Sequence, residues 1–427
     1  MKNITKTYAE VLNKGCSCIT LNKDVLQSHL ANQTQTPNFV QELMLAHPSI
    51  FSSTCVFLSP QHFNAIAEII FSIEEIIKRP LYQEKVMKRA PSIAHRDFGP
   101  KGVLMGYDFH LHNDGPKLIE INTNAGGALL NLELAKAQDL CCRSQEAYLQ
   151  SITELSKVES LFFEMFMNEW KSQKGDEAIN LVAIVDDDPK NQYLYCEFQL
   201  FQHFFSKHNV SSVIVDACEL EWKNGKLCYG DRRIDFVYNR LTDFYLEEES
   251  HAALRLAYES GSTVVTPSPH HHALHAHKLN LVLLSNKEEL VKLNPPSSIQ
   301  EILLQGIPQT QEVIAANDSK LWEMRKDLFF KPDSGFGSKA AYRGDKITKK
   351  VWQHIMQGGY VAQKFSPPGE RFVKVDNKET SLRLDIRAYV YAGKIQLMAA
   401  RLYSGQTTNF RTAGGGFAPV FIVPDAL

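Results

Sequence analysis

The chain has no long hydrophobic run and no excess of charge of one sign. No stretch approaches the roughly 18 apolar residues that a membrane-spanning helix needs, and the N-terminal sequence MKNITKTYAEVLNKG lacks the apolar core of a signal peptide. The 427 residues carry a net charge of −2, so no basic excess points to nucleic acid. We therefore expect a cytoplasmic protein that binds neither membranes nor nucleic acids, with room for about two or three domains.

Closely spaced cysteines are also scarce. Of the eight cysteines, only Cys16 with Cys18 and Cys141 with Cys142 lie near each other, and neither spacing is that of a zinc finger. Scattered cysteines in a large chain are typical of reduced, buried thiols, which agrees with the expected location.

The chain does contain an alternation of predicted helices and strands that indicates an α/β (α+β) protein. Four apolar strands at 179–185, 211–217, 234–240 and 263–269 alternate with predicted helices, which favours a parallel sheet. From Leu328 onward the chain is rich in strands separated by Gly and Pro, which predicts an antiparallel sheet with mobile loops.

These patterns divide the chain into consecutive predicted parts. The parts are a helical segment 1–90, a hairpin and helix 91–178, a parallel α/β unit 179–275, and a segment 276–427 with helices to about residue 310 and the antiparallel sheet after them. In the first part, apolar spacing predicts a helix over 65–80 that ends at Pro80. In the second, a helix is predicted over 129–157.

The most informative segment is a predicted β-hairpin at 102–127. Asn113-Asp114-Gly115 suits a three-residue turn with Gly115 in the left-handed conformation, and this turn places Asp108 opposite Glu120. Strict alternation predicts a core face that consists of Val103, Met105, Tyr107, Phe109, Leu111, Ile119 and Ile121. The other face carries Asp108, His110, Glu120 and Asn122.

Carboxylates that face each other across a strand pair are destabilising unless something neutralises them. Carboxylate and amide oxygens suit Mg²⁺, which binds one or two carboxylates and completes its shell with phosphates and water. The hairpin face with Asp108, Glu120 and Asn122 is therefore a candidate metal–nucleotide site.

A second cluster surrounds Lys331, which ends a predicted strand and precedes a loop of Gly and Ser. Gly335 and Gly337, beside Ser334 and Ser338, would let backbone N–H groups turn toward phosphate oxygens. The loop has neither the spacing of a P-loop nor the lysine position of a kinase. A lid over phosphates and a plain β-turn are both compatible with it.

Residues 360–365 form another predicted strand, which stops at Ser-Pro-Pro-Gly. Such a strand can hydrogen-bond adenine through its backbone edge, with a side-chain contact from Gln363 or Lys364; an ordinary edge strand is the alternative. Arg387 and Arg401 follow on the next two strands. Their planar guanidinium groups suit bidentate phosphate contacts, and a surface or salt-bridge role is the alternative for each.

Near the C-terminus, three consecutive glycines follow Arg411. Gly415 and Gly416 allow backbone conformations that other residues avoid, so this segment is a candidate anion site. A flexible tail is the alternative.

Histidines gather between His270 and His277. His271 and His275 are one helical turn apart and could bind Zn²⁺, although no carboxylate or cysteine lies nearby in the sequence. The alternative is a polar helix start beside Lys278, with one histidine close to adenine.

Taken in order, these motifs resemble those of the circularly permuted ATP-grasp ligases, such as eukaryotic glutathione synthetase and glutathionylspermidine synthetase. Asp108 and Glu120-Ile-Asn122-Thr resemble the aspartate and Glu-x-Asn of that family, and here they precede the lysines, which is the permuted order. Further matches are Lys278 after Val-Val-Thr-Pro, Lys331-Pro, Tyr-Asn-Arg240, and Phe-Arg411-Thr before Gly415-Gly416.

The resemblance implies a carboxylate–amine ligase that uses ATP and Mg²⁺, passes through an acylphosphate and releases ADP and phosphate. It implies metal ligation by Asp108, Glu120 and Asn122. It implies ATP contacts from Lys278, Lys331, Ser334, Gly335, Gly337, Ser338, Gln363 and Lys364. It implies substrate contacts from Arg240, Arg411, Gly415 and Gly416. Arg411 or Arg387 would hold the reacting carboxylate and stabilise the tetrahedral intermediate.

The fold implied by the resemblance is a circularly permuted ATP-grasp. In it, 91–178 would supply the metal-binding part of the core, 179–275 the substrate-side α/β domain and 276–427 the ATP-binding lid. Gly106, Ala125 and Gly127 depart from the glutathione-type pattern, so we expect a different substrate. A small-molecule kinase with the same ATP cleft and a non-catalytic ATP-binding module are the competing interpretations.

Overall fold

The predicted hairpin is present and forms one edge of the largest sheet in the computed structural model, which describes residues 7–16, 18–34, 39–138, 145–335 and 340–424. Strands β2 (Met105–His112) and β3 (Gly115–Asn122) pair antiparallel. Asp108 lies directly opposite Glu120, as predicted.

The turn of the hairpin differs from the prediction. Only Asn113 and Asp114 connect the strands, one residue fewer than expected. A bulge at Ile119 compensates, because it adds one residue to β3 and restores the facing of the two carboxylates. As a result Leu118 is the residue buried in the core, and Ile119 borders a pocket instead.

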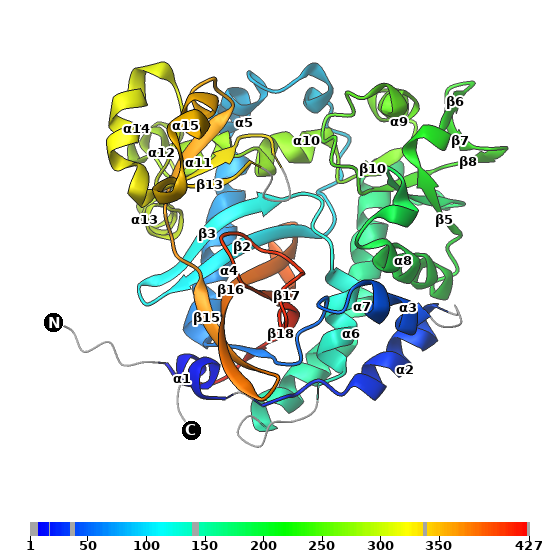
Figure 1. Cartoon of the computed structure of the whole chain (residues 1–427). Helices are drawn as coiled ribbons and strands as arrows, with labels where there is room; N and C mark the ends of the chain where they lie inside the picture. Colours follow the sequence, from blue (N-terminus) through cyan, green and yellow to red (C-terminus); the bar gives the residue numbers. More distant parts are fainter. Residues whose placement is uncertain (1–6, 17, 35–38, 139–144, 336–339, 425–427) are drawn as a thin grey trace.

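The hairpin belongs to a seven-stranded sheet that joins distant parts of the chain (Figure 1). Its strand order is β1-β18-β17-β16-β2-β3, with β15 paired to the first half of β16 and β2 to the second half. The other strands of this sheet are β1 (Val56–Leu58), β15 (Gly369–Val375), β16 (Lys378–Tyr391), β17 (Lys394–Tyr403) and β18 (Gly416–Ile422). Strand β1 lies in a segment predicted to be mainly helical, and it pairs parallel to β18.

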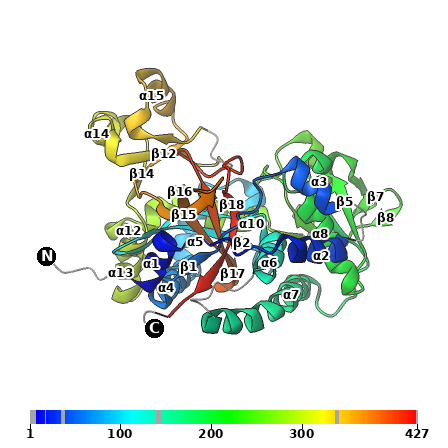
Figure 2. The ribbon, with the colours of Figure 1, turned by 60° about the horizontal axis from the view of Figure 1, so that its bottom comes forward.

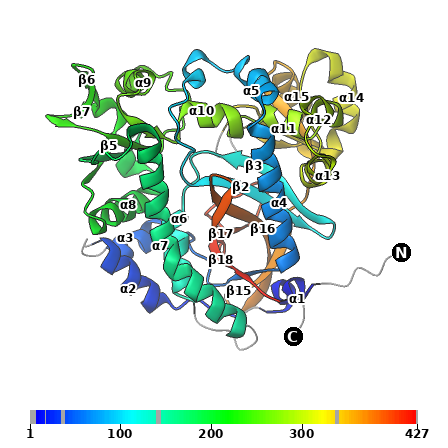
Figure 3. The ribbon, with the colours of Figure 1, turned by 180° about the vertical axis from the view of Figure 1, so that it is seen from behind.

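The two faces of this sheet differ in character. One face is apolar, with Tyr107, Phe109 and Ile386 packed against α4 (Pro60–Ile77) and α13 (Ser297–Gly306). Figure 3 shows α4 lying across the strands on this side. The opposite face carries charged side chains at one end and packs against α6 (Ala128–Lys136) and α7 (Gln145–Lys174) at the other.

Predicted helices are present with altered bounds. The helix predicted over 65–80 is part of α4, which ends at Ile77, and Pro80 begins the next helix. The helix predicted over 129–157 is two helices, α6 and α7. The remaining N-terminal helices are α1 (Tyr8–Gly15), α2 (Lys23–Thr34), α3 (Phe39–Ala46) and α5 (Pro80–Met87). None of the described helices is both long and apolar enough to cross a bilayer.

The predicted parallel sheet is confirmed, with the order β10-β9-β4-β5. Its strands are β4 (Val182–Asp186), β5 (Ser212–Asp216), β9 (Phe236–Asn239) and β10 (Val264–Thr266). Helices α7 and α8 (Tyr195–Lys207) cover one face, and α9 (Ala252–Glu259) covers the other (Figure 1). A small antiparallel sheet of β6 (Glu221–Lys223), β7 (Lys226–Tyr229) and β8 (Arg232–Arg233) adjoins α9.

The strands after Leu328 are divided between two sheets, whereas one sheet was predicted. Those before the Ser-Pro-Pro-Gly segment join the earlier strand β11 in a smaller sheet of order β11-β14-β12-β13, and those after it join the hairpin. The smaller sheet contains β11 (Thr310–Glu312), β12 (Leu328–Pro332), β13 (Tyr342–Arg343) and β14 (Tyr360–Lys364). Its helices are α14 (Asp318–Met324) and α15 (Lys349–Ile355), and this unit projects from the rest of the ribbon (Figure 2). Short helices α10 (Pro269–His271), α11 (Leu279–Leu284) and α12 (Lys287–Leu293) precede it.

The start of β18 explains the glycines near the C-terminus. Gly416 has a φ of +102°, and a Cβ built there would lie 2.4 Å from the carbonyl oxygen of Ser49 and 2.6 Å from that of Ile50. The backbone of Phe417 hydrogen-bonds to the same segment, accepting from Ser52 and donating to Ile50. This close approach, which anchors the N-terminal segment, requires glycine.

We predict that Gly416→Ala lowers the free energy of unfolding by about 3 kcal/mol, because it combines a strained φ with a backbone clash. Gly358→Ala is the matched control, since Gly358 has a similar φ of +104° and open space at its Cβ. Urea denaturation of both variants checks the prediction. Equal losses would mean that the clash at Gly416 is relieved without cost.

Candidate functional site

A pocket of about 100 Å³ lies where the hairpin, the C-terminal strands and the smaller sheet meet. It collects most of the predicted nucleotide and metal residues: Asp108, Glu120, Asn122, Lys278, Lys331, Gly335, Gln363 and Lys364. These residues come from segments that are far apart in the sequence. The sequence-based grouping of these eight residues into one site is therefore consistent with the geometry.

Asp108 is held by two arginines. Nε and Nη2 of Arg387 donate to Oδ1 and Oδ2 of Asp108, both at 2.7 Å, and Nη2 of Arg401 donates to Oδ2 at 2.8 Å. Arg387 lies opposite Asp108 because β16 pairs with β2 in this register. Burial alone would raise the pKa of Asp108, but the two guanidinium groups outweigh it and hold that pKa well below its usual value.

The sequence predicted that a metal ion neutralises the facing carboxylates of the hairpin, whereas in the structure two arginines neutralise Asp108. The protein itself neutralises Asp108, and both of its oxygens already accept hydrogen bonds. A metal ion bound directly to Asp108 would compete with Arg387 and Arg401 for its charge and its oxygens. Ligation by Asp108 stays a prediction, and the geometry favours a role in positioning the arginines.

Glu120 has different surroundings. Burial would raise the pKa of its carboxyl, but the ammonium groups of Lys331 and Lys278 outweigh burial and lower it. The amide Nδ2 of Asn122 donates to Oδ2 of Asp108 at 3.1 Å and to Oε1 of Glu120 at 3.3 Å. This leaves Glu120 and the amide oxygen of Asn122 as ligands that fit Mg²⁺, whose shell phosphates and water would complete.

The two predicted lysines approach Glu120 from different elements. Nζ of Lys331, at the end of β12, donates to the carbonyl of Ile119 at 2.9 Å and to Oε1 of Gln363 at 3.0 Å. Nζ of Lys278 donates to the carbonyl of Gly335 at 2.6 Å. Burial lowers the pKa of Lys331 to about 8, with Glu120 partly opposing the shift, and burial also lowers the pKa of Lys278. A phosphate beside them would stabilise the charged form of both ammonium groups.

The expected adenine contact from a free backbone edge is wrong. Strand β14 is paired on both sides, with β11 and with β12, so its backbone is already hydrogen-bonded. The amide of Gln363 is also engaged, by Lys331 and by Thr310. Of the predicted adenine contacts, the side chain of Lys364, which is exposed and borders the pocket, remains available.

Other predicted residues lie outside this pocket. Arg411 and Ser334 are exposed, and Gly415 and Gly416 pack against backbone carbonyls. Arg240 is buried at the end of the parallel sheet, where Nη1 donates to Ala125 and Tyr238 at 3.4 and 3.3 Å. Gly337 and Ser338 lie outside the described residues.

Sequence reasoning missed the partners of Arg401. Nε of Arg401 donates to Oδ1 of Asp385 at 2.7 Å, and the hydroxyl of Thr408 donates to Oδ2 at 2.7 Å. All three residues line the pocket. The sequence signal was a series of charged residues, Arg383, Asp385 and Arg387, at alternate positions between apolar ones.

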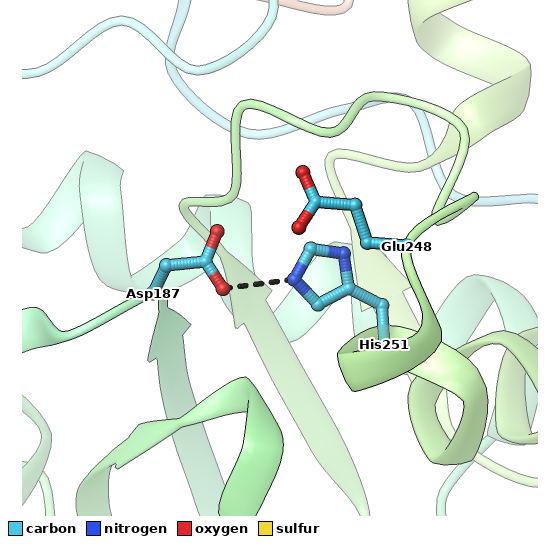
Figure 4. Close-up of side chains that lie close together, drawn as sticks. All are labelled: Asp187, Glu248 and His251. Carbon is cyan, nitrogen blue, oxygen red and sulfur yellow. Dashed lines mark hydrogen bonds and ion pairs between the residues drawn. The ribbon is translucent and has the colours of Figure 1, made fainter.

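The histidines between 270 and 277 do not gather around a common point. His271 lies within hydrogen-bond distance of Ser268 and of the Pro100 carbonyl, and His270 of the Ala94 carbonyl. His275 faces Glu74 at 3.3 Å. Within the described residues, the group with metal-ligand geometry is instead Asp187, Glu248 and His251 (Figure 4).

His251 in that group already has two carboxylate partners. Its ring nitrogens lie 2.8 Å from Asp187 and 2.7 Å from Asp243. Burial would lower the pKa of His251, but the hydrogen bonds to Asp243 and Asp187 outweigh it and raise the pKa to about 9. A cation would have to compete with this proton, so the group is better described as an ion-pair network at the carboxyl edge of the parallel sheet.

Comparison with solved structures places the fold among glutathione synthetase-like proteins. A glutathione synthetase-like effector from Globodera pallida matches 95% of this chain and 99% of its own, with 12% identity and a TM-score of 0.57. A protein from Methylobacillus flagellatus assigned as a gamma-glutamylcysteine synthetase matches 81% and 84%, with 8% identity and a TM-score of 0.46. The ATP-grasp ligase PsnB matches 58% and 92%, with 10% identity and a TM-score of 0.31.

The first of these similarities confirms the predicted resemblance at the level of the fold, a mixed α/β architecture like that of a glutathione synthetase-like protein. No protein-family model matches the chain, and no curated protein sequence is similar to it. The chemistry must therefore be argued from the site.

We predict that Asp108→Asn lowers the free energy of unfolding by about 3 kcal/mol without any added Mg²⁺ or nucleotide, because it leaves the buried guanidinium group of Arg387 without its carboxylate and removes one of the two carboxylates that pair with Arg401. The double variant Asp108→Asn/Arg387→Gln should recover part of the loss, which a double-mutant cycle measures by urea denaturation. An unchanged stability of Asp108→Asn would show that the ion pairs are not the main role of this carboxylate.

A second prediction concerns His251. Because the pKa rises from about 6.5 in the unfolded chain to about 9 in the folded one, its stabilising effect is complete below pH 6.5 and disappears as the pH rises through 9. The free energy of unfolding should fall between pH 6.5 and 9.5, and His251→Gln should weaken that dependence. Urea denaturation of both proteins at several pH values in this range measures the effect. An equal change of the free energy of unfolding with pH in the two proteins would contradict the assignment.

Proposed function

We propose that the chain is an ATP- and Mg²⁺-dependent ligase that joins a carboxylic acid to an amine. The observation that carries the proposal is the convergence of Lys278 and Lys331 on the half-buried Glu120, with the amide of Asn122 beside it. Two cations, a carboxylate and an amide can bind a metal ion together with a triphosphate, and this explains the cluster better than a purely structural ion-pair network does. The glutathione synthetase-like fold supports the same chemistry by analogy.

Each group in the pocket then has a role. Glu120 and Asn122 would hold Mg²⁺, which would supply Lewis-acid stabilisation of phosphate charge. Lys278 and Lys331 would neutralise the triphosphate, with Gly335 beside it. Asp108 would keep Arg387 and the neighbouring Arg401 in place at the other end of the pocket.

The proposed reaction has two steps. A carboxylate oxygen of the acid attacks the γ-phosphorus, the bond to ADP breaks, and an acylphosphate forms. The amine nitrogen then attacks the acyl carbon, phosphate leaves and the amine releases a proton. Positioned cations stabilise the negative charge that builds up in both steps, so catalysis is mainly electrostatic.

Arg387 is better placed than Arg411 to hold the reacting carboxylate. Arg387 is buried and borders a cavity beside the nucleotide pocket, whereas Arg411 is exposed. The loop before Arg411 nevertheless lines the nucleotide pocket through Gln406, Thr407 and Thr408. A substrate contact from Arg411 stays part of the proposal, through movement of this loop toward the pocket.

The products distinguish the proposal from its competitors. Incubation with MgATP, a panel of carboxylic acids and a panel of amines should yield ADP, phosphate and an amide. A phosphorylated product without an amide would indicate a kinase. Binding of MgATP without turnover across the panel would indicate a non-catalytic module, and AMP with pyrophosphate would indicate adenylation.

We predict that Glu120→Gln lowers acid-stimulated ADP release by at least about a hundredfold, because the neutral amide is a weaker metal ligand and leaves Lys278 and Lys331 without their carboxylate. Glu68→Gln makes the same chemical change on the exposed surface of α4 and should leave the rate unchanged. Coupled spectrophotometric detection of ADP measures both variants. Full activity of Glu120→Gln would contradict the proposed metal site.

A further inference from the structure

A second cavity, of about 170 Å³, adjoins the nucleotide pocket. The residues that follow β3 form one wall, and Thr242 and Phe244, which follow β9, contribute another. Asn122, Lys278 and Gly335 line both cavities. A molecule bound in the second cavity would therefore lie beside the phosphates of a nucleotide in the first.

Two buried side chains on the wall of this cavity have no hydrogen-bond partner. His272 is 4% exposed and Thr123 is 2% exposed. Within the described part of the chain, both ring nitrogens of His272 and the hydroxyl Oγ1 of Thr123 lack a hydrogen-bond partner. Buried polar groups in native proteins are almost always paired, so two orphans on one cavity indicate a missing ligand.

The fold holds the His272 ring in place toward that cavity. The ring stacks on Phe244 with centroids 3.9 Å apart and an interplanar angle of 7°, and the edge of Tyr245 meets it at 5.3 Å. His272 also begins a π-helical turn, His272–Ala276. Such turns are uncommon and occur frequently at functional sites.

The charges around this cavity select among ligands. Of its described lining residues, only Lys278 and Arg387 are charged, and none is a carboxylate. Burial lowers the pKa of His272 well below its usual value, so the ring is neutral, with one nitrogen donating and the other accepting. A carboxylate would share two cations here, Arg387 with Asp108 and Lys278 with Glu120, whereas an ammonium group would find no carboxylate among the described lining residues.

We propose, on the basis of the function proposed above, that this cavity binds the acid substrate. We further propose that this acid is small and carries a hydroxyl or amide group near its carboxylate in place of a free ammonium group. His272 and Thr123 hydrogen-bond that neutral group. Lys278 and Arg387 attract the carboxylate, whose attacking oxygen then lies next to the phosphates.

Matched acids test the substrate class. Hydroxylamine serves as the amine, because its nitrogen displaces phosphate from an acylphosphate and leaves a hydroxamate that can be measured together with ADP. Lactate is compared with alanine, and N-acetylglycine with glycine, each with MgATP. The hydroxy or N-acyl acid of each pair should have a kcat/KM at least about tenfold higher than the free amino acid, as expected for a buried ammonium without a counter-charge.

Substitutions test the two orphan side chains. His272→Phe keeps the stacking on Phe244 and removes both nitrogens, and Thr123→Val removes the hydroxyl at nearly constant volume. Each should raise KM for the preferred acid about tenfold while the Kd for MgATP stays unchanged, and His272→Gln should restore part of the loss. His208→Phe is the matched control, because His208 stacks on Phe163 at 3.8 Å and neither residue lines this cavity.

The outcomes separate this inference from the proposed function. MgATP titration first establishes that each variant has a folded nucleotide site. ADP release with a preference for free amino acids, or an unchanged KM in His272→Phe, would overturn the inference and leave the ligase proposal intact. MgATP binding with no ADP release for any acid would overturn both.

Discussion

The site depends on one interaction, the pairing of the buried Asp108 carboxylate with Arg387 and Arg401. This ion pair crosses three neighbouring strands of the large sheet, so it joins the hairpin near residue 110 to strands near residues 387 and 401. Removing a charge of this kind from water is costly, and only close geometry on both sides compensates. The apolar opposite face, packed on α4, supplies that geometry because it fixes the register of all three strands.

A second set of charges connects the large sheet to the smaller one. Lys331 lies near the end of β12, and its ammonium group donates to the carbonyl of Ile119, the bulged residue of β3, and faces Glu120. The bulge thus has two effects: it turns Glu120 toward Asp108, and it presents a carbonyl to the smaller sheet. In the proposed function, a triphosphate would occupy the region between Lys278 and Lys331, with the smaller sheet closing over it. The neighbouring cavity with His272 would then hold the acid at the phosphate end.

The parts of this arrangement that could be predicted are local ones. Alternation along two short strands predicted that Asp108 faces Glu120, although the three-residue turn used for that prediction was wrong and the bulge at Ile119 restored the outcome. The pairing of Arg387 with Asp108 could not be predicted, because it depends on the register between strands that are far apart in the chain. The backbone edge expected at Gln363 was wrong for the same reason, since β11 covers it. The convergence of Lys278 and Lys331 came from the family resemblance, and nothing in the sequence distinguished His272 from its neighbouring histidines.

The most direct test of the central claim is a crystal structure with Mg²⁺ and a non-hydrolysable ATP analogue. We predict that the triphosphate lies between Lys278 and Lys331, that the metal contacts Glu120 and Asn122, and that Asp108 remains paired with Arg387. A nucleotide bound elsewhere would contradict the proposed site. A metal ion bound to Asp108, with Arg387 and Arg401 displaced, would contradict the claim that this ion pair is the constraint on which the site is built.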